Sequence, residues 1–477
     1  MAGNKAGRVA RLLLDVGIFA FGSLLSKIVQ FLLLPLYTGW MSPGEFGVAE
    51  IVFNLSQLLM PLATLSVANG VFRYAMDRID RKTLLSSSLF VVLIGEIIVT
   101  IGACLTTLVK PFEYATFFCI LLLGEALKSD FSSIIRGFGY SKRFAMGGPI
   151  DALLLALFNI VFIGFFHYGV TGYLMALVLA NYLTSVYYFL AGGLWRYLGV
   201  DGVDFGMIKA LLRFSVPMVF NTAIFWFINM SGRFIILWNG GEDLAGCYIA
   251  ASKLPAVINM AVTIFQQAWQ ISSTREIDSE SRDSFYSTIF VHYFYFILAC
   301  SAFAVAICPF LADILLKNEF RKMGYILPLL LTIGMLNGIS TFFGTFYNVF
   351  KQNMMITASS FTASIFAVFG GYLLNIAWGP VGVALGGIVG FSVMAAMRVV
   401  DTRRRFVRIT CDALPIVALS ILYVAQVVVG TMELFAASAL IGAAQLLLIL
   451  FWERRTIARL PVMIKNKMKG RRLRASE

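Results

Sequence analysis

Long apolar stretches separated by short polar turns run along almost the whole chain. A transmembrane helix needs about 20 consecutive, mostly apolar residues. Fourteen stretches meet this requirement, with approximate limits 12–38, 46–72, 84–109, 113–136, 143–167, 170–195, 211–238, 244–270, 285–314, 324–349, 354–377, 380–400, 409–430 and 433–453. The division between 354–377 and 380–400 rests only on Trp378-Gly379-Pro380. The pattern therefore predicts an all-α integral membrane protein with about 14 transmembrane helices.

Composition agrees with this fold class. The 477 residues are 59% hydrophobic and only 13% charged, which excludes a soluble globular or disordered protein and is too apolar for an outer-membrane barrel. Lys5, Arg8 and Arg11 before an apolar run resemble a signal peptide. The run continues to Tyr37 without a small-residue cleavage site, so it is predicted to be the first span.

The basic residues predict the topology. Of 38 lysines and arginines, only four fall in loops on the second side: Lys110, Lys317, Arg321 and Lys322. Nearly all the others lie in loops of the first side and in the C-terminal tail, which places both termini in the cytoplasm. We therefore attribute the net charge of +13 to topology and to attraction of anionic lipids, not to nucleic-acid binding.

An internal repeat divides the chain. Two polar turns each end in a glycine that opens the next helix, at an offset of 199 residues: Thr38-Gly39-Trp40-Met41-Ser42-Pro43-Gly44-Glu45-Phe46-Gly47 and Trp238-Asn239-Gly240-Gly241-Glu242-Asp243-Leu244-Ala245-Gly246. Six spans per repeat give two halves of the same orientation, with a site expected between them. The predicted organisation is an N-terminal lobe 1–200, a C-terminal lobe 201–402, two additional spans 403–455 and a basic cytoplasmic tail 456–477.

Basic residues inside the spans are the main functional signal. A cation in hydrocarbon costs several kcal/mol unless it faces a partner, a cavity or water, so such residues mark substrate pathways. Lys27, Arg233 and Lys253 lie on helices with polar stripes and are expected to contact an anionic ligand. Lys128 could instead neutralise Glu125 or Asp130, and Arg73, near the inner interface, is expected to position the substrate.

Polar residues at helical spacing accompany these cations. Such stripes either join helices to one another or line a water-filled cavity. The stripe in 244–270, which carries Asn259 and Gln266 beside Lys253, favours a cavity, whereas the stripe in 324–349 is open to both interpretations. The predicted substrate-binding residues are Lys27, Arg73, Lys128, Arg233, Lys253, Asn54, Asn229, Asn259 and Gln266.

Energy coupling is expected to use an ion. No G-x-x-x-x-G-K-[ST] sequence occurs, so ATP is not the direct energy source. Glu50, Glu96 and Glu125 are candidates to bind a coupling ion. The six cysteines form no CxxC pair and His167 and His292 stand alone, so no metal site, disulfide framework or cofactor is expected.

Several segments resemble Wzx-type polysaccharide flippases of the multidrug/oligosaccharidyl-lipid/polysaccharide exporter superfamily. In the first half these are Ser26-Lys27, Leu34-Pro35-Leu36-Tyr37-Thr38, Ser42-Pro43-Gly44-Glu45-Phe46-Gly47 and Arg73. In the second half they are Phe214-Ser215-Val216-Pro217, Asn229-Met230-Ser231-Gly232-Arg233, Gly246-Cys247-Tyr248 and Gln267-Ala268-Trp269. Gly232 departs from the family, which often has Asp before Arg, and this leaves Arg233 less constrained.

The resemblance implies two six-helix lobes in a V around an anion-attracting cavity. The implied substrate is an undecaprenyl-pyrophosphate-linked oligosaccharide, flipped from the cytoplasmic to the outer leaflet of the bacterial inner membrane by alternating access. Implied partners are this lipid-linked substrate, membrane lipids, and the polymerase and glycosyltransferases of the same polysaccharide pathway.

Three alternatives stay open. A multidrug antiporter of the same superfamily handles cationic drugs, which an excess of cavity cations would repel. A lipid II flippase carries several arginines in its first span, where this chain has only Lys27. A membrane polysaccharide polymerase or ligase would need a long outer loop with catalytic groups, and because none is present we expect a transporter and not an enzyme.

Overall fold

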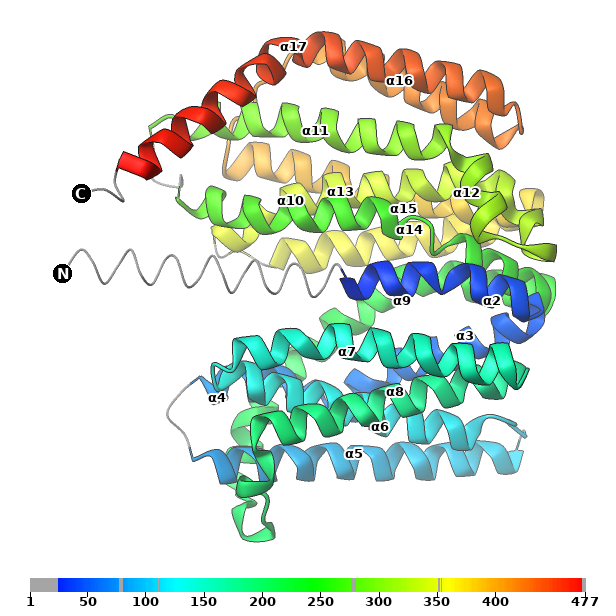
Figure 1. The fold of residues 1–477 in the computed structure, drawn as a ribbon, viewed down its shortest axis with the longest axis vertical. Helices are drawn as coiled ribbons and strands as arrows, with labels where there is room; N and C mark the ends of the chain where they lie inside the picture. Colours follow the sequence, from blue (N-terminus) through cyan, green and yellow to red (C-terminus); the bar gives the residue numbers. More distant parts are fainter. Residues whose placement is uncertain are drawn as a thin grey trace. The chain divides into compact units, whose positions relative to one another are not determined.

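Helices form nearly all of the described chain. The computed structural model describes residues 25–76, 80–109, 111–275, 280–350, 352 and 354–473 (Figure 1), and none of these residues is in a β-strand. Eleven helices within them are long and apolar enough to cross a membrane. The prediction of an all-α integral membrane protein is confirmed.

The helices follow the predicted spans closely. Gly379 has a φ of 55° and separates two long helices, which confirms the division predicted at Trp378-Gly379-Pro380. The bounds are α2 Leu34–Trp40, α3 Pro43–Ala63, α4 Val67–Ala75, α5 Arg81–Val109, α6 Ala115–Gly137, α7 Ser141–Asn159, η1 Ile160–Phe165, α8 Gly169–Gly192, η2 Leu194–Tyr197, η3 Val200–Gly202, α9 Phe205–Ala251, α10 Ala256–Arg275, α11 Arg282–Ala306, α12 Cys308–Leu315, η4 Asn318–Ile326, α13 Leu327–Val349, α14 Met354–Trp378, α15 Pro380–Arg405, α16 Ala413–Thr431 and α17 Phe435–Leu473.

The difference between eleven candidate helices and fourteen predicted spans has simple sources. The predicted spans 211–238 and 244–270 count as one apolar segment, Met230–Gln266, although α9 is kinked between them at Gly241, whose φ of 78° and ψ of -177° are not helical. The helix α6 is not among the eleven and carries Glu125, Lys128 and Asp130 close together. Most of the predicted span 12–38 lies outside the described residues.

Two predicted spans are broken in their interior. The span 46–72 becomes α3 and α4, and between them Leu65 and Ser66 have φ values of 49° and 53°, which non-glycine residues rarely adopt. In the span 244–270 a turn at residues 252–255 separates α9 from α10. Pro255 has no N–H group to continue a helix, so a break is expected here. Lys253 lies within this second break, where irregular backbone at membrane depth is tolerated beside buried protein or a water-lined cavity.

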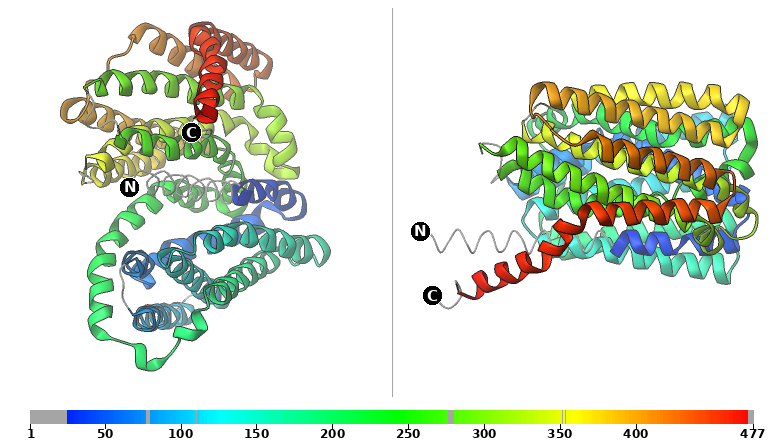
Figure 2. Two further views of the ribbon diagram at one scale, coloured as in Figure 1. Left: turned by 60° about the vertical axis from the view of Figure 1, so that its left-hand side comes forward. Right: turned by 90° about the horizontal axis from the view of Figure 1, so that it is seen from above.

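Packing divides the chain into two compact units. Unit 1 contains Met1–Ala256, Asp313–Met323 and Thr357–Gly390, and unit 2 contains Val257–Ala312, Gly324–Ile356 and Phe391–Glu477. In unit 1, α3 packs along α9, and α8 packs against both α6 and α7. In unit 2, α17 packs against α11 and α16, as Figure 2 shows from two directions. The predicted lobes follow other boundaries and stay a prediction.

The two repeat-related glycines contact each other in unit 1. A β-carbon on Gly47 would lie 2.7 Å from the Glu242 carbonyl oxygen and 3.0 Å from the Gly246 nitrogen. A β-carbon on Gly246 would overlap the Pro43 carbonyl oxygen and lie 3.1 Å from the Gly47 nitrogen. Because Glu242 and Gly246 are the 199-residue equivalents of Pro43 and Gly47, the contact is reciprocal. Reciprocal contacts of this kind are those that a twofold axis generates, so the crossing of α3 and α9 fits the predicted repeat.

Candidate functional site

A buried carboxylate on α3 organises the candidate site. Glu50 is only 1% exposed and forms an ion pair with the Lys253 ammonium. The Tyr173 hydroxyl, from α8, donates a hydrogen bond to the same carboxylate oxygen, Oε1. Glu50 lies one helical turn beyond Gly47, so both residues are on the same face of α3. Because α3 and α9 are in backbone contact at Gly47, this face directs Glu50 toward α9. The pair therefore depends on the close crossing of these two helices.

Arg233 of α9 adds a second cation to this site. Its Nη1 donates a hydrogen bond to Asn54 Oδ1 at 3.2 Å, so its direct partner there is neutral. Arg233 Nε and Asn54 Nδ2 are buried and make no hydrogen bond within the described residues. Two cations, Arg233 and Lys253, face one carboxylate, Glu50, so the group carries a formal excess of one positive charge. We call Glu50, Asn54, Tyr173, Arg233 and Lys253 the Glu50 cluster.

Aromatic rings surround the cluster. The Lys253 ammonium lies 5.9 Å from the Tyr37 ring centroid and 5.2 Å from that of Phe46. Tyr37 also packs edge-on against Tyr173, with centroids 5.1 Å apart. Aromatic faces attract cations while excluding water, so the buried Glu50 carboxylate acts in a medium of low dielectric constant, whereas Lys253 is partly exposed. An electrostatic interaction with a ligand is stronger there than at the protein surface.

A second group of carboxylates includes the buried Glu125 of α6 and the half-buried Asp151 of α7. Glu125 is 4% exposed and accepts hydrogen bonds from Gln57 Nε2 at 2.7 Å and Ser56 Oγ at 3.2 Å. Lys128, expected to contact ligand or to neutralise Glu125 or Asp130, instead binds both oxygens of Asp151 at 3.1 Å. The charge of Lys128 also acts on Glu125, but its hydrogen-bonded partner was not predictable, because spacing along α6 cannot reveal an acid that α7 supplies. The role of Lys128 in substrate binding stays a prediction.

Two further carboxylates are buried, Glu96 on α5 and Asp130 on α6. Asp130 is fully buried and accepts a hydrogen bond from the Ser88 hydroxyl at 2.9 Å. Glu96 is 8% exposed, and its Oε1 lies 3.5 Å from the Thr100 hydroxyl. Glu96 Oε2 is buried without a hydrogen bond in the described part of the chain. The part of Glu50, Glu96 and Glu125 in ion coupling stays a prediction.

The predicted polar stripe of unit 2 joins two helices. Asn259 Oδ1 accepts a hydrogen bond from Asn337 Nδ2 at 3.3 Å, between α10 and α13. Gln266 Nε2 donates to the Thr345 hydroxyl and lies 3.4 Å from the Thr341 carbonyl oxygen. These contacts agree with the interpretation that the stripes join helices. Substrate binding by Asn259 and Gln266 stays a prediction.

The positions of Lys27 and Arg73 on their helices are described, whereas the side chain of Asn229 is not. Lys27 is half-buried in the helical stretch 25–32, and Arg73 is exposed in the last turn of α4. The side chain of Asn229 lies outside the described residues.

Sequence reasoning missed four residues that hold these sites together. Tyr37 and Tyr173 frame Lys253, and Asp151 pairs with Lys128. In unit 2, Arg398 is 7% exposed and donates to the carbonyl oxygens of Ser340 at 3.1 Å and Ile356 at 3.5 Å. Asp151 and Arg398 carried a usable signal, because both are charged residues within predicted spans, 143–167 and 380–400.

Comparison with known proteins identifies the fold. No family model and no curated protein sequence matches the chain. An inward-facing multidrug resistance MATE family transporter of the MOP superfamily matches with 17% identity and a TM-score of 0.60, covering 82% of this chain and 93% of its own. An outward-facing one matches with 18% identity and a TM-score of 0.58, covering 82% and 95%.

A third solved structure comes from Pyrococcus furiosus. This MOP superfamily transporter is 16% identical, with a TM-score of 0.58 and coverage of 82% of this chain and 95% of its own. In that protein, the reversed polarity of the binding pocket suggests a different function. Together these likenesses show that the chain has the fold of MATE family transporters, a multi-pass membrane fold.

Proposed function

We propose that the chain is a membrane transporter and that its substrate is an undecaprenyl-pyrophosphate-linked oligosaccharide. The substrate would move from the cytoplasmic to the outer leaflet by ion-coupled alternating access. Two findings support the proposal: the fold is that of MATE family transporters, and the Glu50 cluster holds two half-buried cations for one buried carboxylate.

The proposal rests on the hydrogen-bond donors of Arg233 that have no partner in the described residues. A guanidinium group has five N–H donors in a planar fork that matches phosphate oxygens. In the Glu50 cluster one nitrogen is bound to a neutral amide, and the buried Nε has no hydrogen-bond partner in the described residues. Arg233 therefore retains donors for an anion, and a diphosphate supplies the charge and oxygens that would satisfy them.

A multidrug transporter shares this fold and is the main rival. A cationic drug near the Glu50 cluster would meet Arg233 and Lys253, and only Glu50 would attract it. Because like charges in a low-dielectric site repel strongly, the cluster disfavours a cation. The polarity of the cluster is thus the property that separates the two candidate substrates.

Replacement of Arg233 by glutamine should slow the flipping of a lipid-linked oligosaccharide. Hydrogen bonds to charged groups contribute about 1.5–3 kcal/mol, so the rate should fall roughly 10- to 100-fold. The measurement uses proteoliposomes with a fluorescent undecaprenyl-diphosphate oligosaccharide in the inner leaflet and a membrane-impermeant quencher outside. Arg233→Lys, which keeps the charge but not the fork, should retain an intermediate rate.

Two controls make this test specific. Arg321→Gln removes an exposed arginine that pairs with Asp313, and it should leave the flipping rate unchanged. The same liposomes loaded with ethidium test the rival. Ethidium export without movement of the lipid-linked sugar, or an Arg233→Gln variant as fast as the wild type, would overturn the proposal.

We further propose that Glu125 takes part in ion coupling. Its carboxylate is buried and bound by Ser56 and Gln57 of α3, so a change in its charge would alter contacts between α3 and α6. Glu125→Gln should flatten the dependence of the transport rate on pH while leaving substrate binding intact. A pH profile identical to that of the wild type would remove Glu125 from the coupling site.

A further inference from the structure

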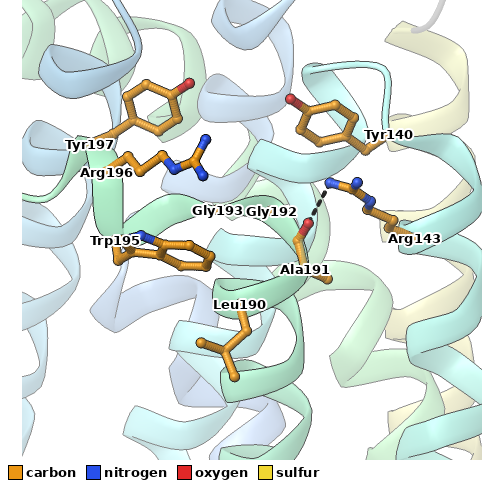
Figure 3. Close-up of a pocket in the computed structure, with 9 residues that line it drawn as sticks. All are labelled: Tyr140, Arg143, Leu190, Ala191, Gly192, Gly193, Trp195, Arg196 and Tyr197. Carbon is orange, nitrogen blue, oxygen red and sulfur yellow. Dashed lines mark hydrogen bonds between the residues drawn. The ribbon is translucent and has the colours of Figure 1, made fainter.

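A pocket of about 530 Å³ opens in unit 1 where α8 ends. Its walls include Tyr140 and Arg143 at the start of α7, and Trp195, Arg196 and Tyr197 of η2. Figure 3 shows the two guanidinium groups pointing into this space from opposite sides. None of the residues that line the pocket belongs to the Glu50 cluster.

The two arginines are held in place but keep free donors. Arg143 Nη1 donates to the Ala191 carbonyl oxygen at 2.6 Å, and the Arg196 guanidinium lies 5.5 Å from the Trp195 ring centroid. These contacts use few of the five N–H groups on each side chain. Both arginines are exposed, and no salt bridge of either one occurs in the described ranges.

A third arginine, Arg81, holds the side chains of Tyr140 and Tyr197 in place. Arg81 Nη1 lies 3.1 Å from the Tyr197 hydroxyl and 3.4 Å from the Tyr140 hydroxyl, and donates to both. Its guanidinium also lies 4.4 Å from the Phe138 ring centroid. The pocket is therefore built before a ligand arrives, with positive charge on two sides and behind the tyrosines.

Nearby carboxylates are engaged elsewhere. Asp80 caps α5 through the Thr83 hydroxyl and amide, and these hydrogen bonds hold the pKa of Asp80 below its usual range. Asp201 pairs with Lys82 at 3.5 Å, and Asp204 accepts hydrogen bonds from the first amides of α9. No carboxylate occurs among the described residues that line the pocket, so the charge balance at this place calls for an anion.

The apolar surroundings indicate where that anion comes from. Leu190, Trp195 and Leu198 beside the pocket are 57%, 49% and 55% exposed. Exposed Trp and Tyr next to Arg are typical of the membrane–water boundary, where rings lie at the level of lipid headgroups. The positive-inside pattern predicts that this boundary is the cytoplasmic one, whose leaflet carries anionic lipids.

We propose that this pocket binds the phosphate group of an anionic phospholipid, with Arg143 and Arg196 donating to its oxygens and Trp195 packing against the glycerol backbone. A phosphate accepts bidentate hydrogen bonds from guanidinium groups. A volume of this size holds a headgroup together with a few water molecules. The site is independent of the transported substrate, so it stands whether that substrate is a lipid-linked sugar or a drug.

Trp195 provides a reporter for this site. The protein is placed in phosphatidylcholine nanodiscs, and brominated phosphatidylglycerol or brominated phosphatidylcholine is added at equal mole fraction. Subtracting the quenching of Trp195→Phe isolates the signal of Trp195. Quenching at low mole fraction should require roughly tenfold less phosphatidylglycerol than phosphatidylcholine, and Arg143→Gln/Arg196→Gln should remove that preference. Because the comparison is made within each variant, a change in intrinsic Trp195 emission cancels.

A charge-matched variant separates the pocket from the general surface potential. Lys142 and Lys209 are exposed basic residues of the same unit that do not line the pocket. Lys142→Gln/Lys209→Gln should keep the lipid preference. Equal loss in both double variants, or an unchanged preference in the arginine variant, would contradict the site. Inorganic phosphate at constant ionic strength should not relieve the quenching; relief would mean that the pocket takes its phosphate from water and not from lipid.

Discussion

Gly246→Ala should cause a large loss of stability, on the order of 3 kcal/mol or more, because small-to-large changes in a packed core cost about 1–3 kcal/mol and this one meets backbone. The added methyl group would overlap the Pro43 carbonyl oxygen, which cannot rotate away as a side chain can. α3 and α9 would have to separate, and this would draw Glu50 away from Lys253. The measurement is the apparent melting temperature of the purified protein in lipid nanodiscs.

Two other glycine-to-alanine changes calibrate this result. Gly47→Ala meets the Glu242 carbonyl oxygen at 2.7 Å and should be the milder of the two variants at the crossing. Gly102 in α5 has no atom within 4 Å of an added β-carbon, so Gly102→Ala should be neutral or stabilising by up to about 1 kcal/mol. The expected order of stability is Gly102→Ala, Gly47→Ala, Gly246→Ala. If Gly246→Ala has the same apparent melting temperature as Gly102→Ala, then α3 and α9 do not cross as closely as the structure shows.

The helices could be predicted because membrane insertion leaves few alternatives. In hydrocarbon every backbone polar group must be satisfied within the chain, so an apolar run of sufficient length becomes a helix. The division at Trp378-Gly379-Pro380 followed from local chemistry, since Pro380 begins α15 and Gly379 takes a positive φ. The break at Leu65 and Ser66 was not predictable in this way, because neither residue favours the left-handed region and packing must hold them there.

The candidate site was predicted in its residue types but not in its pairings. Cations inside spans were recognisable from their desolvation cost, and Arg233, Lys253 and Asn54 do lie in one cluster around the buried Glu50. Helical spacing gives the face on which a side chain lies, but not the neighbouring helix that this face meets. For this reason the partners from distant segments, Tyr173 for Glu50 and Asp151 for Lys128, emerged only from the fold.

Glu50→Gln should be the most destabilising change within the Glu50 cluster. Removing one partner of a buried ion pair costs about 3–5 kcal/mol. We expect about 3 kcal/mol, because the Lys253 side chain keeps 28% exposure and is partly screened. Glutamine would leave Arg233 and Lys253 as two like charges without an anion. Lys253→Gln should cost less, because Glu50 would still have the Arg233 charge and the Tyr173 hydroxyl.

A double-mutant cycle tests whether these charges act as one unit. The stability of Glu50→Gln/Lys253→Gln should exceed the value obtained by adding the two single changes, by about 1–3 kcal/mol, because each single variant leaves a buried charge and the double variant removes both. Glu319→Gln, which breaks only an exposed pair with Lys322, should change stability by less than about 1 kcal/mol. Additive effects of Glu50→Gln and Lys253→Gln would mean that the ion pair does not form in the folded protein. In that case Lys253 would be as available to an anion as Arg233, and the excess of positive charge in the cluster would be larger than the contacts of Glu50 imply.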